Sequence, residues 1–172
     1  CRCFDCRQVL YEESMFDGQK VSKSRIITSV DYSMVSMEAF EIYAANHDIH
    51  VMDFVLKLDA YSYYMMNLLD YLTGNTDRHW GNWGFLVDNR TNQPVRLFDL
   101  MDLNQTFLAY DTPDGANCMT TGNRKMSQRE AAVEAVKKIG LNQRAEIKDE
   151  WFEGREKERE MFWCRFGILK EQ

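Results

Sequence analysis

Three polar side chains in the middle of the chain have the types and the spacing that phosphate chemistry needs. Asp77 and Asn82 lie five residues apart, and Asp99 follows a segment with the pattern of a β-hairpin. An ionised aspartate can accept the proton of an attacking hydroxyl that lies within hydrogen-bond reach. Carboxylate and amide oxygens are hard ligands of the kind that Mg²⁺ prefers. The order therefore predicts a base at Asp77 and metal ligands at Asn82 and Asp99.

A structural role is the alternative for the same residues. Asp77 and Asn82 would then cap a turn, and Asp99 would cap the loop after a strand. The spacing of Asp77 and Asn82 alone occurs often by chance. A helix before the pair, a hairpin after it and an aspartate at the end of the second strand make the pattern more specific.

Helical patterns flank this central stretch on both sides. A wide apolar stripe over residues 51–72 predicts a long amphipathic helix, and Gly74 is placed to end it in a left-handed conformation. Residues 33–46 also have near-helical spacing of apolar residues. After the central stretch, a capping box opens a helix over residues 127–139, and a charged helical pattern covers residues 143–169.

Strand patterns are fewer and shorter. Residues 85–87 and 95–98 predict two strands joined by a polar turn, which would return the chain so that the metal ligands face one ion. Residues 7–11 are a strand candidate, Asp17-Gly18 is a turn signal, and a return strand could start within residues 21–27. The expected fold class is therefore α+β and predominantly α.

The central motif also resembles that of a known protein family. Asn75-Thr-Asp-Arg-His-Trp-Gly-Asn82-Trp-Gly-Phe, followed by Leu97-Phe-Asp99, resembles the C-terminal part of HipA-like kinases, bacterial proteins with a serine/threonine-kinase fold. The resemblance is strongest over residues 68–104 and extends more weakly over most of the chain. It implies a protein-kinase-like C-lobe in which a small β-hairpin carries the catalytic loop and the metal aspartate. It also implies phosphoryl transfer from ATP, with Mg²⁺, to a serine or threonine of a protein substrate.

The resemblance implies a role for each residue of the motif. Asp77 is the catalytic aspartate, and Asn82 and Asp99 hold Mg²⁺. His79 joins the catalytic residues, where ordering the loop by hydrogen bonding suits it better than proton transfer. Two further residues are candidates on the cofactor side. Arg78 could contact a phosphate or a loop carboxylate, or lie on the surface, and Asp102 is a rival to Asp99, which we prefer because it ends the strand directly.

The N-terminal part departs from the kinase pattern. A complete kinase of this kind has a glycine-rich loop over the phosphates and a lysine that pairs with ATP. Here only Gly18 precedes Gly74, and neither Lys20 nor Lys23 has a strand context that would make it that lysine. We therefore expect only weak binding of Mg-ATP by the chain alone.

The expected domain organisation follows from that departure. The whole chain, residues 1–172, is of the size of one domain. Residues 1–30 would be a remnant of the connection to an N-lobe or a hairpin, and residues 31–172 would be the helical C-lobe. A start at Cys1 rather than at a methionine agrees with a fragment or a processed product.

Composition limits the classes of partner. The net charge of −6 argues weakly against non-specific binding to nucleic acid, and no apolar run approaches the length of a membrane span. A cytoplasmic protein without membrane contact is expected. Cys1, Cys3 and Cys6 lack a frame of four ligands, so we favour thiols in a reducing cytosol over a zinc site.

Two functions from different classes remain open. The first is the HipA-like kinase activity, doubtful in the chain alone because half of the ATP cleft is missing. The second is a non-catalytic interaction or regulatory module, pseudokinase-like or part of a split toxin–antitoxin pair. Its partner would be a separately encoded N-lobe or an antitoxin-like regulator. The Asp-Arg-His run alone suggests a third, lipid-kinase activity.

Overall fold

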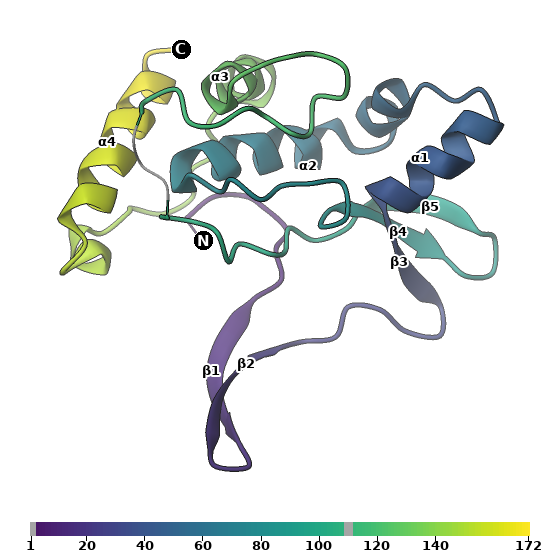
Figure 1. The fold of residues 1–172 in the computed structure, drawn as a ribbon, viewed down its shortest axis with the longest axis horizontal. Coiled ribbons are helices and arrows are strands. Elements are labelled where there is room, and N and C mark those ends of the chain that lie inside the picture. The colour runs from purple at the N-terminus through teal and green to yellow at the C-terminus, as the bar shows by residue number, and fades with distance from the viewer. Residues whose placement is uncertain (1–2, 109–111) are drawn as a thin grey trace.

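A long helix runs through the middle of the computed structural model, which describes residues 3–108 and 112–172. In Figure 1 this helix, α2, lies across the centre, with α3 beside it, α1 and one sheet at one end, and α4 at the other. The elements are, in order, β1 (Tyr11–Phe16), β2 (Gln19–Ser24), β3 (Tyr32–Ser36), α1 (Met37–Asn46), α2 (Val51–Thr73), β4 (Gly84–Asp88), β5 (Gln93–Leu97), α3 (Gln128–Ile139), a 3₁₀ helix η1 (Asp149–Phe152) and α4 (Glu156–Lys170).

Helix α2 forms because its apolar stripe has a core to face. Val55, Met65 and Leu68 are fully buried on it. It ends as predicted at Gly74, whose φ of 62° is the left-handed conformation that glycine adopts without steric cost. The prediction of one continuous helix is wrong at Asp59, where φ of −155° and ψ of 63° break the helical path.

The break has a local cause. The Asp59 carboxylate accepts hydrogen bonds from the backbone N–H of Ser62 (3.2 Å) and of Leu97 in β5 (3.1 Å), and it pairs with Arg7 at 2.5 Å. An aspartate that bonds backbone groups competes with the helical ladder. Here the competition joins α2 to the sheet and to the N-terminal segment.

The sheet β3-β4-β5 is antiparallel throughout, and the predicted hairpin is its β4–β5 part. The prediction of helix over residues 33–46 is wrong for residues 33–36. These form β3, which pairs with β4 from Tyr32 opposite Asp88 to Ser36 opposite Gly84. Helix α1 starts only after this pairing ends, with Ser36 as its N-cap. Gly84 is required where it stands, because a Cβ there would lie 2.1 Å from the Val35 carbonyl oxygen.

Strands β1 and β2 form a separate two-stranded ribbon that projects away from the helices in Figure 1. The predicted turn at Asp17-Gly18 is confirmed, with φ of 54° and 77° at the two residues. The expectation that Lys20 and Lys23 lack a strand context is wrong, since both lie on β2. Each pairs with a glutamate of β1, Lys20 with Glu13 at 2.9 Å and Lys23 with Glu12 at 3.4 Å.

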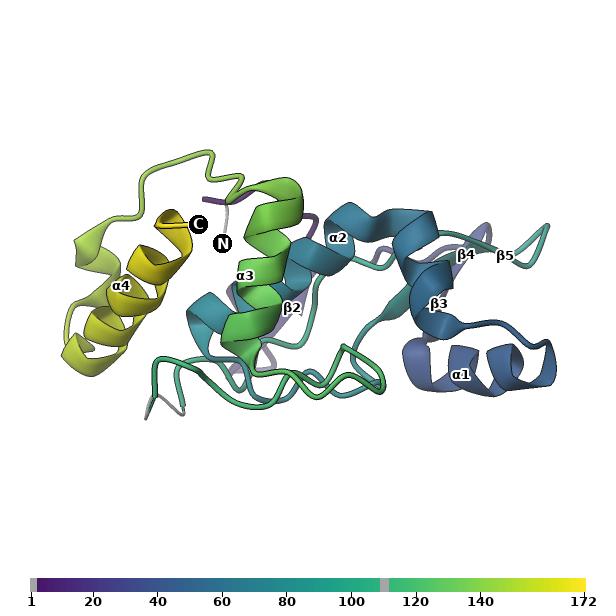
Figure 2. The same cartoon turned by 90° about the horizontal axis from the view of Figure 1, so that it is seen from above.

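The C-terminal region differs most from its predicted helix. The capping box before α3 is confirmed, but the expected helix over residues 143–169 is regular only at η1 and from Glu156 onward. Its first residues pair instead with the N-terminal segment, where the Arg144 N–H donates to the Cys3 carbonyl at 2.7 Å. Gly154, with φ of 71°, then interrupts the path. In Figure 2, α4 and α1 lie at opposite ends of the molecule with α2 and α3 between them.

The described residues therefore form a mixed α+β fold of four α-helices and two small antiparallel sheets. No helix among them has the length and apolar character needed to cross a bilayer. Of the cysteines, Cys3, Cys6, Cys118 and Cys164 are free thiols, and Cys1 lies outside the described residues. Burial raises the pKa of the Cys6 thiol to about 11.

Candidate active site

The loop between α2 and β4 carries the predicted base. Asp77 lies on it with 41% of its side chain exposed, so the carboxylate is open to solvent. The Asp77 N–H donates to the Asn75 side-chain oxygen at 3.4 Å, while Asn75 itself is completely buried. The loop is thus anchored by a buried residue and presents an exposed carboxylate, which a hydroxyl group from solvent or from a substrate can reach.

Asn82 closes the loop from the other end. Its side-chain Nδ2 donates to the Asp77 carbonyl and lies 3.5 Å from Oδ2 of Asp102. Its Oδ1 is buried and has no hydrogen-bond partner among the residues described. A buried polar atom without a partner is costly, so its persistence calls for a ligand, an ion or a water molecule. The pair Asp77 and Asn82 is therefore brought together as the spacing predicts.

Arg78 lies inside the protein, with 3% of its side chain exposed. Its Nε and Nη2 donate to the two carboxylate oxygens of Asp70 in α2, at 2.8 and 3.0 Å. Its Nη1 donates to the carbonyls of Asn82 (3.0 Å) and Met101 (2.7 Å). The surface alternative for Arg78 is wrong. One buried guanidinium instead ties together α2, the loop and the segment that leads into Asp102.

Asp70, Asn75 and Gln128 support the loop from inside, and the sequence motif includes Asn75 but neither Asp70 nor Gln128. The Asp70 carboxylate also accepts from Asn75 Nδ2 at 2.9 Å, and Gln128 at the start of α3 donates to the Asn75 carbonyl at 2.5 Å. The sequence does offer one signal for Asp70, because a charged residue on the apolar stripe of a helix indicates a buried polar contact. Asp70 stands between Leu69 and Tyr71, and a buried carboxylate needs a cationic or hydrogen-bonding partner nearby.

The two aspartates that compete for a metal have different surroundings. Asp99 Oδ1 is paired with Nη1 of Arg96 at 2.6 Å, and only 17% of the Asp99 side chain is exposed. A cavity of about 20 Å³, enough for one water molecule, is lined by Asn82, Trp83 and Asp99 among others. Asp102 has no ion pair within the described part of the chain and lies beside the Asn82 amide. Of the two carboxylates, Asp102 is thus the one without an ion pair among the described residues, and Asp99 is the one that shares a cavity with Asn82.

The His79 side chain makes its contacts with neighbouring residues of its own loop and is largely exposed to solvent. Its Nδ1 accepts the Gly81 N–H at 3.0 Å, and its Nε2 lies 4.0 Å from Asp77 Oδ1. An accepting Nδ1 places the proton of the neutral ring on Nε2, the nitrogen that faces the aspartate. The ring therefore holds the turn at Gly81 and lies near the carboxylate, at a distance too long for a hydrogen bond.

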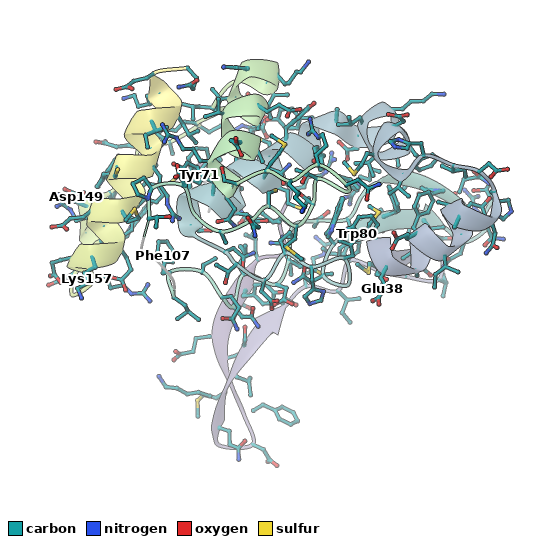
Figure 3. All side chains as sticks on the ribbon, turned by 45° about the horizontal axis from the view of Figure 1, so that its top comes forward. Glu38, Tyr71, Trp80, Phe107, Asp149 and Lys157 are labelled. Atoms are coloured by element: carbon teal, nitrogen blue, oxygen red, sulfur yellow. The ribbon has the colours of Figure 1, made fainter. Side chains whose placement is uncertain are left out.

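Helix α1 fixes the outer side of the loop. The Met37 and Glu38 N–H groups, at the start of α1, donate to the carbonyls of Trp83 (2.8 Å) and Trp80 (3.0 Å). The Trp80 indole N–H donates to the Met119 carbonyl at 2.9 Å. Figure 3 shows Trp80 and Glu38 as neighbours at this end of the molecule. The loop is thereby held between two helices and the segment around Met119.

The donor atoms fit a hard divalent cation. Asn82 Oδ1 and the Asp102 carboxylate are oxygen ligands, and Mg²⁺ is commonly bound by one or two protein oxygens together with phosphates and water. No three His, Cys, Asp or Glu side chains cluster as a metal site in residues 3–108 and 112–172. With Asn82 and Asp102 as the two protein ligands, phosphate oxygens and water would supply the rest of the coordination shell.

Comparison with known proteins identifies the fold. No family model matches the sequence, and no curated protein sequence matches it significantly. Among solved structures, a proinflammatory kinase of Helicobacter pylori, CtkA, is similar with a TM-score of 0.61 and 12% sequence identity. The match covers 96% of this chain and 78% of that chain. The fold is kinase-like. At this level of identity the similarity describes the fold, and the roles of the residues rest on the geometry above.

Proposed function

We propose that the chain is the C-terminal part of a kinase that transfers the terminal phosphoryl group of ATP to a serine or threonine hydroxyl with Mg²⁺. The observation that carries this proposal is Asn82. Its amide nitrogen is held by the Asp77 carbonyl and lies beside Asp102, while its amide oxygen is buried and has no hydrogen-bond partner among the described residues. The kinase-like fold supports the same function.

In this proposal each residue has one task. Asp77 accepts the hydrogen bond of the substrate hydroxyl and then its proton. His79 holds the turn of the loop by accepting the Gly81 N–H, and its Nε2 lies 4.0 Å from the Asp77 carboxylate. Asn82 and Asp102 hold Mg²⁺, which when bound neutralises charge on the transferred phosphoryl group. Arg78 acts as a positioning residue, because its hydrogen bonds to the carbonyls of Asn82 and Met101 set the distance between the two metal ligands.

The activity is tested by incubation of the chain with Mg²⁺ and radiolabelled ATP, with phosphate incorporation as the readout. We expect slow, Mg²⁺-dependent incorporation that is lost in Asp77→Asn, and weak ATP binding in a calorimetric titration. Asp114→Asn, a change of an exposed aspartate outside the loop, is the matched control. Incorporation that persists at the same rate in Asp77→Asn would overturn the role of this residue.

The choice of metal ligand has its own test. Mn²⁺ replaces Mg²⁺ and is followed by electron paramagnetic resonance in the presence of ATP. We expect Asp102→Asn to weaken Mn²⁺ binding about tenfold or more, and Asp99→Asn to weaken it less, because Asp99 already pairs with Arg96. A larger loss of Mn²⁺ binding in Asp99→Asn than in Asp102→Asn would assign the metal to Asp99.

The exposed ribbon favours a second candidate, a module that binds a protein partner without catalysis. Nearly all residues of β1 and β2 are exposed on both faces, including Phe16 at 74% and Met15 at 61%. An isolated two-stranded hairpin is marginal in water, so a partner such as a separate N-lobe or a regulator would stabilise it. Partner binding that is unchanged by Asp77→Asn, with no phosphorylation of chain or partner, would favour this module.

A further inference from the structure

A groove of about 980 Å³ lies next to the active-site loop and has no role in the chemistry described above. One wall comes from the end of α1 and the start of α2, and the other from residues 117–126. The walls are largely apolar and rich in methionine. Their apolar side chains include Ile49, Met52, Leu56, Met119 and Met126. Unbranched methionines adapt to differently shaped apolar partners.

The groove is continuous with the loop that carries Asp77. Trp80, three residues after Asp77, lines the groove, and its indole N–H donates to the Met119 carbonyl in the opposite wall at 2.9 Å. A molecule in the groove therefore touches the same turn of chain that presents the candidate base. This neighbourhood suits the molecule that provides the hydroxyl.

The second wall is held in place, so the groove is largely preformed. The Cys118 N–H donates to the Met126 carbonyl at 2.8 Å and closes the segment into a loop. At its tip, Gly122 has φ of 62°, and a Cβ there would lie 3.2 Å from Cγ of Met52 in α2. The loop thus touches the first wall directly. A preformed groove loses less free energy to ordering when a ligand binds.

The charges of the groove differ between its two walls. Its charged lining residues are Glu41, Asp53, Arg124, Lys125 and Glu134, with His50 as the titratable neighbour of Asp53 at 3.0 Å. Arg124 is already paired with Glu134 at 3.1 Å. The helical wall therefore presents two carboxylates, Glu41 and Asp53, that attract a cation, while Lys125 lies on the opposite wall.

We propose that this groove binds the protein substrate as an extended segment with one large apolar side chain and one Lys or Arg side chain. The apolar side chain enters the methionine-lined middle, and the basic side chain lies against Glu41 and Asp53 on the helical wall. The inference rests on the proposed kinase function, since it assigns the substrate class of that site. It makes α1 and α2 determinants of specificity as well as scaffold.

The test uses fluorescein-labelled peptides and the 172-residue chain without nucleotide, with fluorescence anisotropy as the readout. The peptides have a Gly/Ser host sequence with one Leu. One set also carries an Arg that is moved through each position, a second set carries Glu in its place, and a third has neither. We expect the best Arg-Leu peptide to bind at least tenfold more tightly than its Glu counterpart.

Two variants and one control locate the binding. Glu41→Lys should weaken the Arg-Leu peptide about tenfold and leave the peptide without Arg unchanged. Met52→Ser should weaken both peptides by about threefold to tenfold. Glu160→Lys, the same charge reversal on exposed α4, should change neither. No binding of any peptide, unchanged affinity in both groove variants, or displacement of the peptide by ATP would overturn the proposal.

The same variants separate this proposal from the proposed function. Peptide binding is measured again in Asp77→Asn, where we expect no loss. Peptides that bind in the groove but are never phosphorylated would leave the groove assigned and refute kinase activity of this chain alone. Peptides that are phosphorylated equally well by wild type, Glu41→Lys and Met52→Ser would refute the groove and leave the kinase activity standing.

Discussion

Two β-hairpins among the described residues are both antiparallel but have opposite surroundings. Every residue of β4 is buried, between β3 and β5 in the sheet and against the helices. In the β1–β2 ribbon only Ser14 and Val21 are even partly buried. Hydrogen bonding differs as well, because β4 pairs on both edges, whereas β1 and β2 pair only with each other.

This difference shows where the molecule is preorganised. A hairpin alone is marginally stable in water and gains its stability from what packs on it. The β4–β5 hairpin follows Asn82 and leads to Asp102, so the candidate metal ligands are attached to the buried one. The ribbon has only its turn and two exposed ion pairs, which contribute at most about 1 kcal/mol each. Rigidity is thus placed at the site, and exposed strand edges are left where a partner can bind.

The largest effect should come from the buried ion pair behind the β4–β5 hairpin. Asp70→Asn leaves the Arg78 guanidinium buried without its counter-charge, and we expect it to lower the free energy of unfolding by about 3–5 kcal/mol. Urea denaturation followed by tryptophan fluorescence measures the change. Asp114→Asn, which breaks the exposed pair with Arg129, is the control and should cost about 1 kcal/mol or less. Equal costs for both variants would show that Asp70 and Arg78 are not a buried support of the loop.

A smaller effect is expected where β3 and β4 approach each other. Gly84→Ala places a Cβ against the Val35 carbonyl, and we expect a loss of about 1–3 kcal/mol together with loosened β3–β4 pairing. Hydrogen exchange of the β3 and β4 amides reports the pairing, and urea denaturation reports the stability. Gly167→Ala in α4 is the control of opposite sign, because its Cβ would meet nothing within 4 Å and alanine favours a helix. A stabilised Gly84→Ala would contradict the close approach.

Local signals predict the local parts of this structure, and tertiary contacts decide the rest. Asp17-Gly18, Gly74 and the capping box at Ser127 each fix a turn or a helix end through backbone preferences that act within a few residues. Helical spacing over residues 33–36 and 143–148 misleads, because distant segments, β4 and the N-terminal stretch, pair with these backbones instead.

The candidate site divides in the same way. The spacing of Asp77 and Asn82 brings their loop together as expected. The choice between Asp99 and Asp102 depends on features that the sequence does not display, namely the ion pair between Arg96 and Asp99 and the left-handed backbone of Asp102, with φ of 54°.

The turn of the β4–β5 hairpin should make stability sensitive to acid. The Arg90 side chain and the N–H groups of Arg90 and Thr91 donate to the Asp88 carboxylate and lower its pKa in the folded protein. Its contribution is therefore present above the unfolded pKa of about 3.9 and is lost as the pH falls through the folded value. Asp88→Asn should lower the urea midpoint at about pH 7 and flatten its decrease toward about pH 3. Asp17→Asn in the ribbon turn should leave the urea midpoints at both pH values nearly unchanged, and a parallel shift at both pH values in Asp88→Asn would refute the linkage.

The smallest effect should come from the ribbon, and one pair of phenylalanines compares the two hairpins directly. Phe85 on β4 is fully buried and packs against Phe40 with ring centroids 4.6 Å apart, whereas Phe16 on β1 is 74% exposed. Phe16→Ala should change the free energy of unfolding by no more than about 0.5 kcal/mol, while Phe85→Ala should cost about 3–5 kcal/mol. Urea denaturation of both variants measures this.

Hydrogen exchange should be fast in β1 and β2 and slow in β4 of the wild type. A loss of more than about 2 kcal/mol in Phe16→Ala, or protected ribbon amides in the isolated chain, would mean that the ribbon is already covered, by the chain itself or by a second copy. Dilution distinguishes cover by the chain itself from cover by a second copy, because only protection by a second copy decreases as the protein concentration falls.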